Sequence, residues 1–329
     1  MRVNLSIFSS KKSAPFLIKS VAFLLLLILA DWGIGSAIGF LYRKAPYGAN
    51  WTKENWLLNK KYDVVILGSS RALRHYVPGV IAEETGLSVF NAGQNGQYML
   101  YSYGLEQLLL SHYAPKLIVL DVLPSFIIKT DNPNEEFERL STLSPFIEND
   151  SVRGLLTRGN VFENLKYASH MYRYNSKILS ILENFRSPVD NVDNGYEVMG
   201  DMKYHDRNPF IVDRLNTVEI DSFKLEILQK FITSAHAQNV NVIASFSPVC
   251  EPVSKRAADI LQFYSSLFSE LNTPFLNFTT TDYDHYMNLE LFIDNIHMDG
   301  IGAEQFSTEF GKRLSTMRND NLLDLAHCE

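Results

Sequence analysis

Five short apolar runs, each rich in valine, isoleucine and leucine, alternate with longer stretches whose apolar residues recur at helical spacing. Runs this apolar suit strands buried on both faces, as in a parallel sheet covered by helices. The pattern predicts strands at 62–68, 87–93, 116–122, 240–248 and 273–278. It predicts helices between them at 77–85, 98–112, 222–238 and 254–271. Together these elements predict a three-layer α/β/α domain with a mostly parallel five-stranded sheet.

Residues 124–217 interrupt this alternation between the third and fourth predicted strands. The interval is polar and rich in turn-forming residues, and it encloses one predicted helix at 161–185. Ligands bind open α/β sheets at the carboxyl ends of the strands, so an insertion here could cover a site at that edge. Decoration packed elsewhere on the domain is the alternative, and the sequence favours neither.

The first 45 residues differ from the rest, because an apolar run from Val21 to Leu41 contains only one charge, Asp31. As a helix this run spans about 30 Å, the thickness of a hydrocarbon core. Lysines and an arginine precede it, which predicts a single-pass anchor in the cytoplasmic (inner) membrane with the following domain on the extracytoplasmic side. A cleaved secretory signal and a buried helix of a soluble protein are the alternatives. Asp31 is costly at membrane depth, so it either faces a partner or reaches the interface.

We therefore divide the chain into a tail and anchor at 1–45 and an α/β domain at 46–329. The formal net charge of -7 comes from interspersed acidic and basic residues, with no basic stripe that would hold a nucleic acid. The two cysteines, Cys250 and Cys328, show no metal-ligand spacing. We expect no disulfide framework, no metal and no cofactor.

Two adjacent serines follow the first predicted strand, in the stretch "DVVILGSSR". Gly68 permits a tight exit from the strand, and Ser69 and Ser70 then begin the next helix. Backbone N–H groups point outward there and the helix dipole favours negative charge, so a hydroxyl at this turn is well placed for acyl transfer. Serine is also a favoured helix cap, which is the simpler explanation of the pair.

A carboxylate and an imidazole lie three residues apart in the polar stretch "DNIHMDGIG", as Asp294 and His297. A serine nucleophile needs a base, and the base needs an acceptor that fixes its tautomer, so this pair could supply both. An exposed loop in which Asp299 caps the helix at 303–314 is the simpler alternative. In "FNAGQNGQ", Gly93, Asn95 and Gly96 could bring donors to an oxyanion, although a tight turn also explains the glycines.

In this order the three motifs resemble those of the SGNH (GDSL-like) hydrolase superfamily. The resemblance is to its membrane-anchored envelope branches, related to polysaccharide O-acetylation proteins and to D-alanine transfer proteins of teichoic acid. It implies a flavodoxin-like fold, Ser70 as nucleophile, His297 as base and Asp294 as the carboxylate that orients it. It also implies that Gly96 donates its backbone N–H to the oxyanion.

One departure concerns the third predicted strand, where the larger family carries Gly-x-Asn-Asp. This chain has "LDVLPSF", which supplies no asparagine after Asp121. Asn95, Ser125 or a residue of the insertion could substitute for the missing donor. Losing one such donor commonly costs about 100- to 1000-fold in turnover. Transfer within a complex would tolerate this loss better than free hydrolysis.

Two further features bear on the substrate. Arg71 follows the serine pair and could bind an anionic sugar or a carboxylate, although a solvated or ion-paired arginine is commoner there. The segments around 170–179 and 194–208 are rich in tyrosine, which suits stacking on sugar rings but more often serves packing.

These observations predict a membrane-anchored serine acyltransferase or esterase that acts on acyl groups, acetyl first among them, of a cell-envelope polysaccharide. The expected partners are that glycan, a membrane-bound acyl-donor protein and the membrane itself through one helix. A non-catalytic accessory protein of a polysaccharide-modification complex and a plain carboxylesterase are the alternatives.

Overall fold

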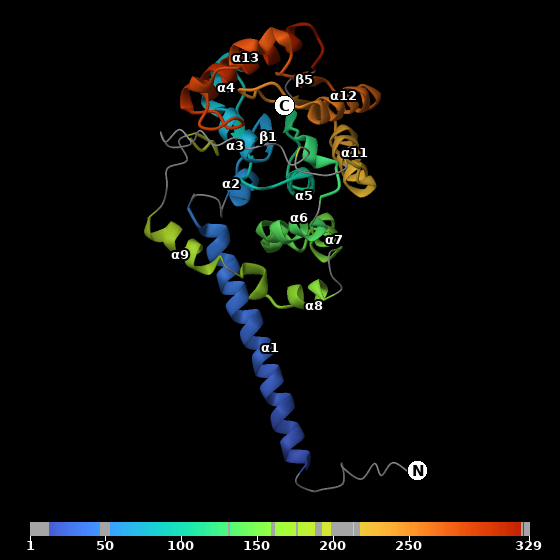
Figure 1. The fold of residues 1–329 in the computed structure, drawn as a ribbon. Coiled ribbons are helices and arrows are strands. Elements are labelled where there is room, and N and C mark those ends of the chain that lie inside the picture. Colours follow the sequence, from blue (N-terminus) through green and yellow to red (C-terminus); the bar gives the residue numbers. More distant parts are fainter. Residues whose placement is uncertain are drawn as a thin grey trace, which may run out of the picture.

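The computed structural model describes residues 13–46, 53–130, 132–158, 162–175, 177–187, 193–198, 213, 218–323 and 325. Five parallel strands in these segments form one sheet of order β2-β1-β3-β4-β5. The strands are β1 (Val64–Gly68), β2 (Val89–Asn91), β3 (Leu117–Asp121), β4 (Asn241–Phe246) and β5 (Phe275–Asn277). The predicted three-layer α/β fold is confirmed, since each predicted run contains one of these strands (Figure 1).

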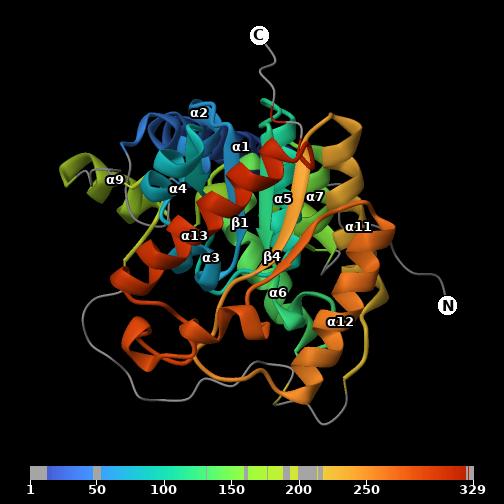
Figure 2. The same ribbon diagram turned by 90° about the horizontal axis from the view of Figure 1, so that it is seen from above.

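The helices of the domain are α2 (Lys53–Asn59), α3 (Ser70–His75), α4 (Pro78–Thr85), α5 (Met99–Leu110), α11 (Ser222–Ala237), α12 (Lys255–Glu270) and α13 (Gly300–Asn319). Strand side chains alternate between the two faces of the sheet. Val65 and Leu67 belong to a core cluster with α5, α11 and α12, whereas Val64 and Ile66 belong to a second cluster with α4 and α13. Figure 2 shows α13 and α4 crossing one face of the sheet with α5 behind it.

The sheet brings a row of polar residues to its carboxyl edge. Gly68 at the end of β1 pairs with Asp121 at the end of β3, and Asp121 pairs with Ser245 of β4. The chain leaves β1 toward β2 on one side and later places β3 on the other side. Ligands of open α/β sheets bind at such a switch in strand order, outside the carboxyl ends.

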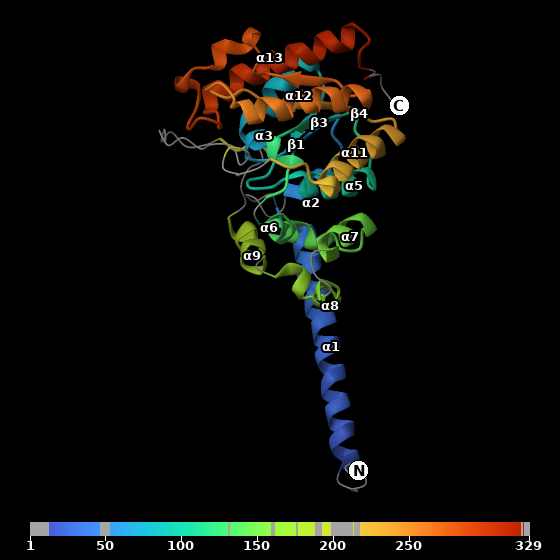
Figure 3. The same ribbon diagram turned by 45° about the vertical axis from the view of Figure 1, so that its right-hand side comes forward.

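The insertion between β3 and α11 is mostly helical. It comprises η2 (Pro124–Phe126), α6 (Pro133–Arg139), η3 (Leu140–Phe146), α7 (Asp150–Arg158), α8 (Glu163–Ala168), η4 (Tyr172–Tyr174) and α9 (Ile178–Arg186). A buried carboxylate, Glu136, holds α6 to the domain, because it accepts from the backbone of Leu100 at 3.1 Å and pairs with Lys224 at 2.7 Å. Figure 3 shows α6, α7 and α8 between α5 and the lower part of α1.

The single helix predicted at 161–185 is wrong, since α8, η4 and α9 are separate pieces. The chain turns at Ser169, whose backbone is extended and whose hydroxyl donates to Asp31 at 2.5 Å. The next N–H groups, of His170 and Met171, also bind the Asp31 carboxylate. Because these N–H groups donate to a carboxylate of another helix, they do not form the hydrogen bonds that would continue α8.

The amino-terminal helix α1 (Ser13–Lys44) extends away from the domain. Its portion 15–44 is long and apolar enough to span a membrane, and an 18-residue window within it has a mean hydropathy of 2.2. Its last third packs on the insertion. Gly35 and Gly39 allow this close approach, because a Cβ at Gly35 would lie 2.5 Å from the His170 backbone and one at Gly39 would lie 2.5 Å from the Tyr174 hydroxyl. Small residues at this spacing are typical of helices packed in membranes.

Replacing Gly35 by leucine should loosen the insertion from α1, because the new side chain meets backbone atoms that cannot rotate away. Overpacking of this kind commonly costs about 1–3 kcal/mol. We expect roughly tenfold faster tryptic cleavage at Lys166 and Arg173 of the full-length protein in detergent micelles. Gly33→Leu is the matched control on the same helix, because nothing lies within 4 Å of a Cβ there. Equal cleavage of the two variants would contradict this packing.

Candidate active site

Three side chains from two distant parts of the chain form one line of hydrogen bonds at the carboxyl edge of the sheet. The Oγ of Ser70 lies 2.8 Å from Nε2 of His297. The Nδ1 of the same ring lies 2.8 Å from Oδ2 of Asp294. The structure therefore brings together the serine, imidazole and carboxylate that the sequence motifs single out, in the order that a nucleophile, its base and an orienting acceptor require.

The turn after β1 gives the two adjacent serines different hydrogen-bond partners. Gly68 has φ +148°, a conformation that side chains disfavour, and a Cβ there would lie 2.8 Å from the Ala72 side chain. Ser69 caps α3, because its hydroxyl accepts from the backbone N–H of Arg71 at 3.3 Å, and it is buried. Ser70 begins the helix with its hydroxyl toward His297. The helix-cap explanation thus holds for Ser69, and Ser70 is the serine beside the imidazole.

Hydrogen bonds within the loop fix the conformation of the segment that carries Asp294 and His297. Oδ1 of Asp294 accepts from the backbone N–H groups of Ile296 at 2.9 Å and His297 at 2.8 Å. The backbone of Ile293 donates to the carbonyl of His297 at 2.9 Å. Asp299 caps α13 by accepting from Gly302 at 2.8 Å. The predicted helix cap and the Asp-His pair therefore exist side by side in this loop.

Burial and hydrogen bonding act in opposite directions on the Asp294 carboxyl. Burial raises its pKa, but the hydrogen bonds from His297 and from two backbone N–H groups outweigh burial, so the pKa lies below the usual 3.8. The Asp294 side chain is 7% exposed and that of His297 is 15% exposed. The carboxylate is thus ionised at neutral pH and shielded from water, in contact with Nδ1 of His297.

The loop after β2 contains the predicted oxyanion groups. Gly96 has φ +67°, and the guanidinium of Arg139 from α6 lies where its Cβ would be. The exposed Asn95 accepts from Arg74 at 3.4 Å, and Gln97 donates to the Arg139 carbonyl at 3.0 Å. The insertion therefore adjoins this edge of the sheet through α6. Gly96 and Asn95 as oxyanion donors stay predictions, because these contacts do not place them against Ser70.

Arg71 is placed differently from either expectation for it. Its side chain is 1% exposed and lies over the Phe246 ring, with 4.2 Å from its Cζ atom to the ring centroid. Nη2 donates to the hydroxyl of Ser247 at 2.8 Å and also to the Ser247 carbonyl. The guanidinium is therefore part of the buried interior.

A buried histidine behind the site was not predicted. His75, the last residue of α3, is fully buried, and the backbone N–H of Met298 donates to its Nε2 at 3.1 Å. Since Nε2 accepts, Nδ1 carries the proton and donates to the Ser247 hydroxyl at 2.9 Å. Burial and the nearby charges of Arg71 and His297 hold the pKa of His75 well below 6.5. His75 thus joins α3 to the loop of His297.

The carboxylate at the end of β3 also serves the interior. Oδ1 of Asp121 accepts from the hydroxyl of Tyr76 and from the backbone of Ser247, both at 3.0 Å. Burial raises the pKa of Asp121. Ser125, one of the residues considered as a replacement donor, is 5% exposed within η2. Asp121 at the end of β3 therefore stabilises the backbone where the chain leaves β4.

Asn91, in β2, is a further residue that the sequence analysis missed. Its side-chain amide donates to the carbonyls of Ala72 at 2.7 Å and Tyr76 at 2.8 Å, and its Oδ1 accepts from Gly93. It thereby satisfies carbonyls at the end of the helix that begins with Ser70. A polar residue inside an otherwise apolar strand was the available signal, as it was for Asp121.

Two other expectations concern packing and metals. Tyr174 is buried against α1 and the Tyr172 ring packs on Tyr167 at 5.4 Å, whereas residues 199–208 of the second tyrosine-rich segment lie outside the described residues. Within the part of the chain that the structure describes, no three His, Cys, Asp or Glu side chains are grouped to hold a metal. Cys250 is buried, and Cys328 lies outside the described residues.

No protein-family model matches this sequence, and no curated protein matches it either. A solved structure from Bacteroides fragilis NCTC 9343, described as a candidate acylhydrolase, has a TM-score of 0.37 and 10% identity over 79% of this chain and 87% of that chain. Another from Streptococcus pneumonia, described as a candidate platelet activating factor, has a TM-score of 0.33 and 15% identity over 93% and 99%. Because both matches are this distant, neither assigns an activity to this chain.

Acid should destabilise the protein through His75. Below pH 6.5 the unfolded chain binds a proton at this residue that the native state does not bind, so stability falls as the pH falls. The slope contributed by one such group reaches about 1.4 kcal/mol per pH unit. We expect His75→Gln to have a shallower dependence of unfolding free energy on pH between 6.5 and 5, measured by urea unfolding. The same slope in both proteins would mean that native His75 takes up a proton in this range.

Proposed function

We propose that this protein is a serine-dependent acyl-transfer enzyme of the SGNH type. The observation that carries the proposal is the hydrogen-bonded line from Ser70 through His297 to Asp294, in which the serine and the histidine are 227 residues apart in sequence. Helix capping does not explain these hydrogen bonds, because Asp299 already caps α13 and Ser69 already caps α3.

In the proposed reaction, His297 Nε2 accepts the Ser70 proton as Oγ attacks the acyl carbonyl carbon. The bond from that carbon to the leaving oxygen then breaks, and the imidazolium returns the proton to the leaving hydroxyl. An acceptor hydroxyl, or water, repeats these steps in reverse and frees the serine. Asp294 holds the Nδ1 proton and stabilises the imidazolium. The backbone N–H groups of Ser70 and Gly96 would hold the oxyanion.

The proposed substrates are acyl groups, acetyl first among them, of a cell-envelope polysaccharide. Transfer is favoured over hydrolysis because Asp121, at the position after which the larger family has an asparagine donor, is committed to Tyr76 and Ser247. An enzyme with one donor fewer is better suited to a substrate delivered in a complex. A membrane-bound acyl-donor protein is the proposed partner, with α1 as the anchor and the domain on the extracytoplasmic side.

A serine-directed fluorophosphonate should add once to the full-length protein, as measured by intact-mass spectrometry. Ser70→Ala and His297→Ala should abolish the adduct, because one removes the nucleophile and the other its base. Ser69→Ala is the matched control, which should keep the adduct and lose only a helix cap, worth about 1 kcal/mol. An adduct that survives in Ser70→Ala would refute the assignment. No adduct on the folded wild type would favour the accessory protein.

Asp294→Asn should keep the adduct but form it far more slowly. The amide cannot stabilise the imidazolium and favours the wrong tautomer of His297, a change that lowers turnover roughly 10,000-fold in a serine triad. The measurement is the second-order rate constant of fluorophosphonate labelling. Asp299→Asn, which keeps a capping side chain on α13, should label at the wild-type rate. Equal rates for Asp294→Asn and wild type would remove Asp294 from the mechanism.

A further inference from the structure

An unusual share of the exposed large apolar side chains gathers on one short part of the insertion, which we name the α8–α9 segment (residues 162–175 and 177–187). Outside α1, seven of the thirteen such residues that the structure describes lie on it. They are Phe162, Leu165, Met171, Ile178, Leu179, Leu182 and Phe185. Apolar patches of this kind mark surfaces that contact a protein or a membrane.

Helix α9 has its apolar stripe on the outside. Ile178, Leu182 and Phe185 are exposed at the spacing that puts them on one face, and Leu179 beside them is 81% exposed. The neighbouring face packs inward, since Ile181 is 1% exposed and clusters with Ile38 and Tyr42 of α1. A helix on a water-soluble domain shows the reverse order, with polar side chains outward.

The α8–α9 segment contacts α1 at the level where a bilayer would end. Lys19 and Asp31 are twelve residues apart, about 18 Å of helix, which is too short for a hydrocarbon core of about 30 Å. A core that begins level with Phe16 to Lys19 therefore ends between Gly35 and Gly39. The turn at Ser169 and η4 touch α1 at Asp31, Gly35 and Gly39, so the segment flanks that boundary.

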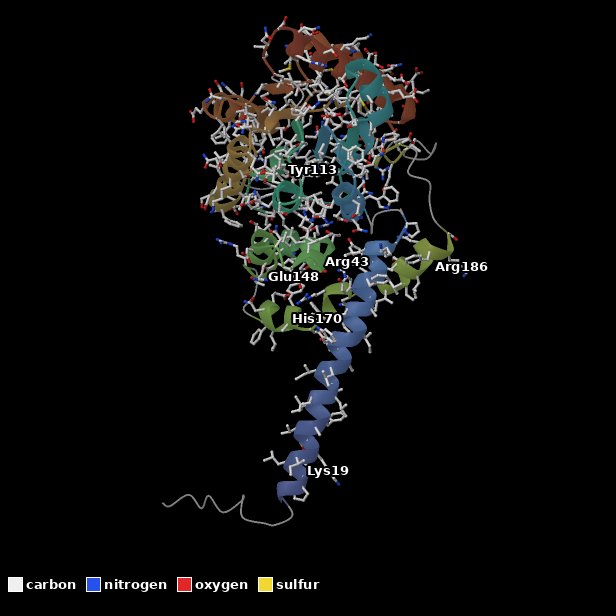
Figure 4. All side chains as sticks on the ribbon, turned by 180° about the vertical axis from the view of Figure 1, so that it is seen from behind. Lys19, Arg43, Tyr113, Glu148, His170 and Arg186 are labelled. Atoms are coloured by element: carbon white, nitrogen blue, oxygen red, sulfur yellow. The ribbon has the colours of Figure 1, made fainter. Side chains whose placement is uncertain are left out.

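Three basic residues, Arg43, Lys44 and Arg186, lie on the side of this boundary nearer the domain. Figure 4 shows Lys19 near the far end of α1, His170 where the insertion meets α1, and Arg43 and Arg186 nearer the domain. The last turn of α1 carries Arg43 and Lys44. Basic residues next to an apolar helix face are typical of segments that lie in a membrane interface.

From these observations we propose that the α8–α9 segment lies in the lipid bilayer interface, in the leaflet nearer the α/β domain, with its exposed apolar side chains among the lipids beside α1. The proposal depends on α1 crossing the membrane and not on the chemistry of Ser70. It also accounts for Asp31, whose carboxylate accepts from Ser169, His170 and Met171 and so keeps its hydrogen bonds at membrane depth.

A second copy of the chain is the other surface that could cover these side chains. The lipid bilayer is the better occupant because the patch is continuous with α1, whose exposed residues from Phe16 to Leu29 need lipid in any case. A copy-to-copy contact would not require the patch to lie level with the end of the apolar span.

The test places an environment-sensitive NBD fluorophore on single cysteines of the full chain, after Cys250→Ala and Cys328→Ser, in phosphatidylcholine vesicles with or without nitroxide lipids. The nitroxide is at carbon 5 for the labels at 179, 182 and 322, and at carbon 12, nearer the bilayer centre, for the label at 26. Leu179→Cys and Leu182→Cys report on α9, and Leu26→Cys reports on α1 itself. Leu322→Cys is the matched control, since this leucine is 63% exposed and follows shortly after the end of α13. Figure 1 shows α13 on the side of the domain away from α1.

We expect the nitroxide lipids to quench the labels at 179 and 182 at least twofold more than the label at 322. Quenching at 26 but not at 179 or 182 would overturn the interfacial placement and leave the anchor intact. A blue-shifted, unquenched label at 179 would show that another copy covers the patch, and it would overturn the proposal too. No quenching at 26 would mean that α1 is not in the bilayer, with the same consequence.

Discussion

The hydrogen bonds of Ser247 hold the carboxyl edge of the sheet together. Its hydroxyl meets Arg71 and His75 of α3, and its backbone N–H donates to Asp121 at the end of β3. Through His75 the same group reaches the backbone next to His297. Because buried polar groups are costly when unpaired, these partners cannot shift independently. These bonds lie on the interior side of the site and thereby fix the distance between the Ser70 hydroxyl and the His297 ring.

The need to pair polar groups that are shielded from water also operates at the other end of the molecule, where Asp31 interrupts an apolar helix. A carboxylate there requires donors, and the turn at Ser169 supplies one hydroxyl and two backbone N–H groups. Meeting this requirement breaks the insertion into separate helices and brings its backbone against Gly35. A single acidic residue in α1 thus determines the shape of a segment more than a hundred residues later in the chain.

Apolar periodicity was enough to predict the five strands and the main helices, because burial on both faces leaves a continuous apolar signature. The serine, histidine and aspartate were also found, since each lies in a short polar motif at the end of an element. The positions of Arg71 and His75 were not predictable, because a basic residue after a strand is interpreted as solvent-exposed unless its buried partners are known. The break in the helix at 161–185 was missed for a related reason, as its cause, Asp31, lies on another element.

The contact between α1 and the insertion determines how α1 is joined to the α/β domain. Gly35, Gly39 and Tyr42 pack on η4 and α9, and the insertion is in turn held to the domain by the buried pair of Glu136 and Lys224. The helix is therefore a rigid stem and not a flexible tether. Any tilt of α1 in a bilayer, which membrane thickness can change, would rotate the carboxyl edge of the sheet with it. In the enzyme proposed above, the thickness of the membrane would then set the height and direction from which the proposed glycan meets Ser70.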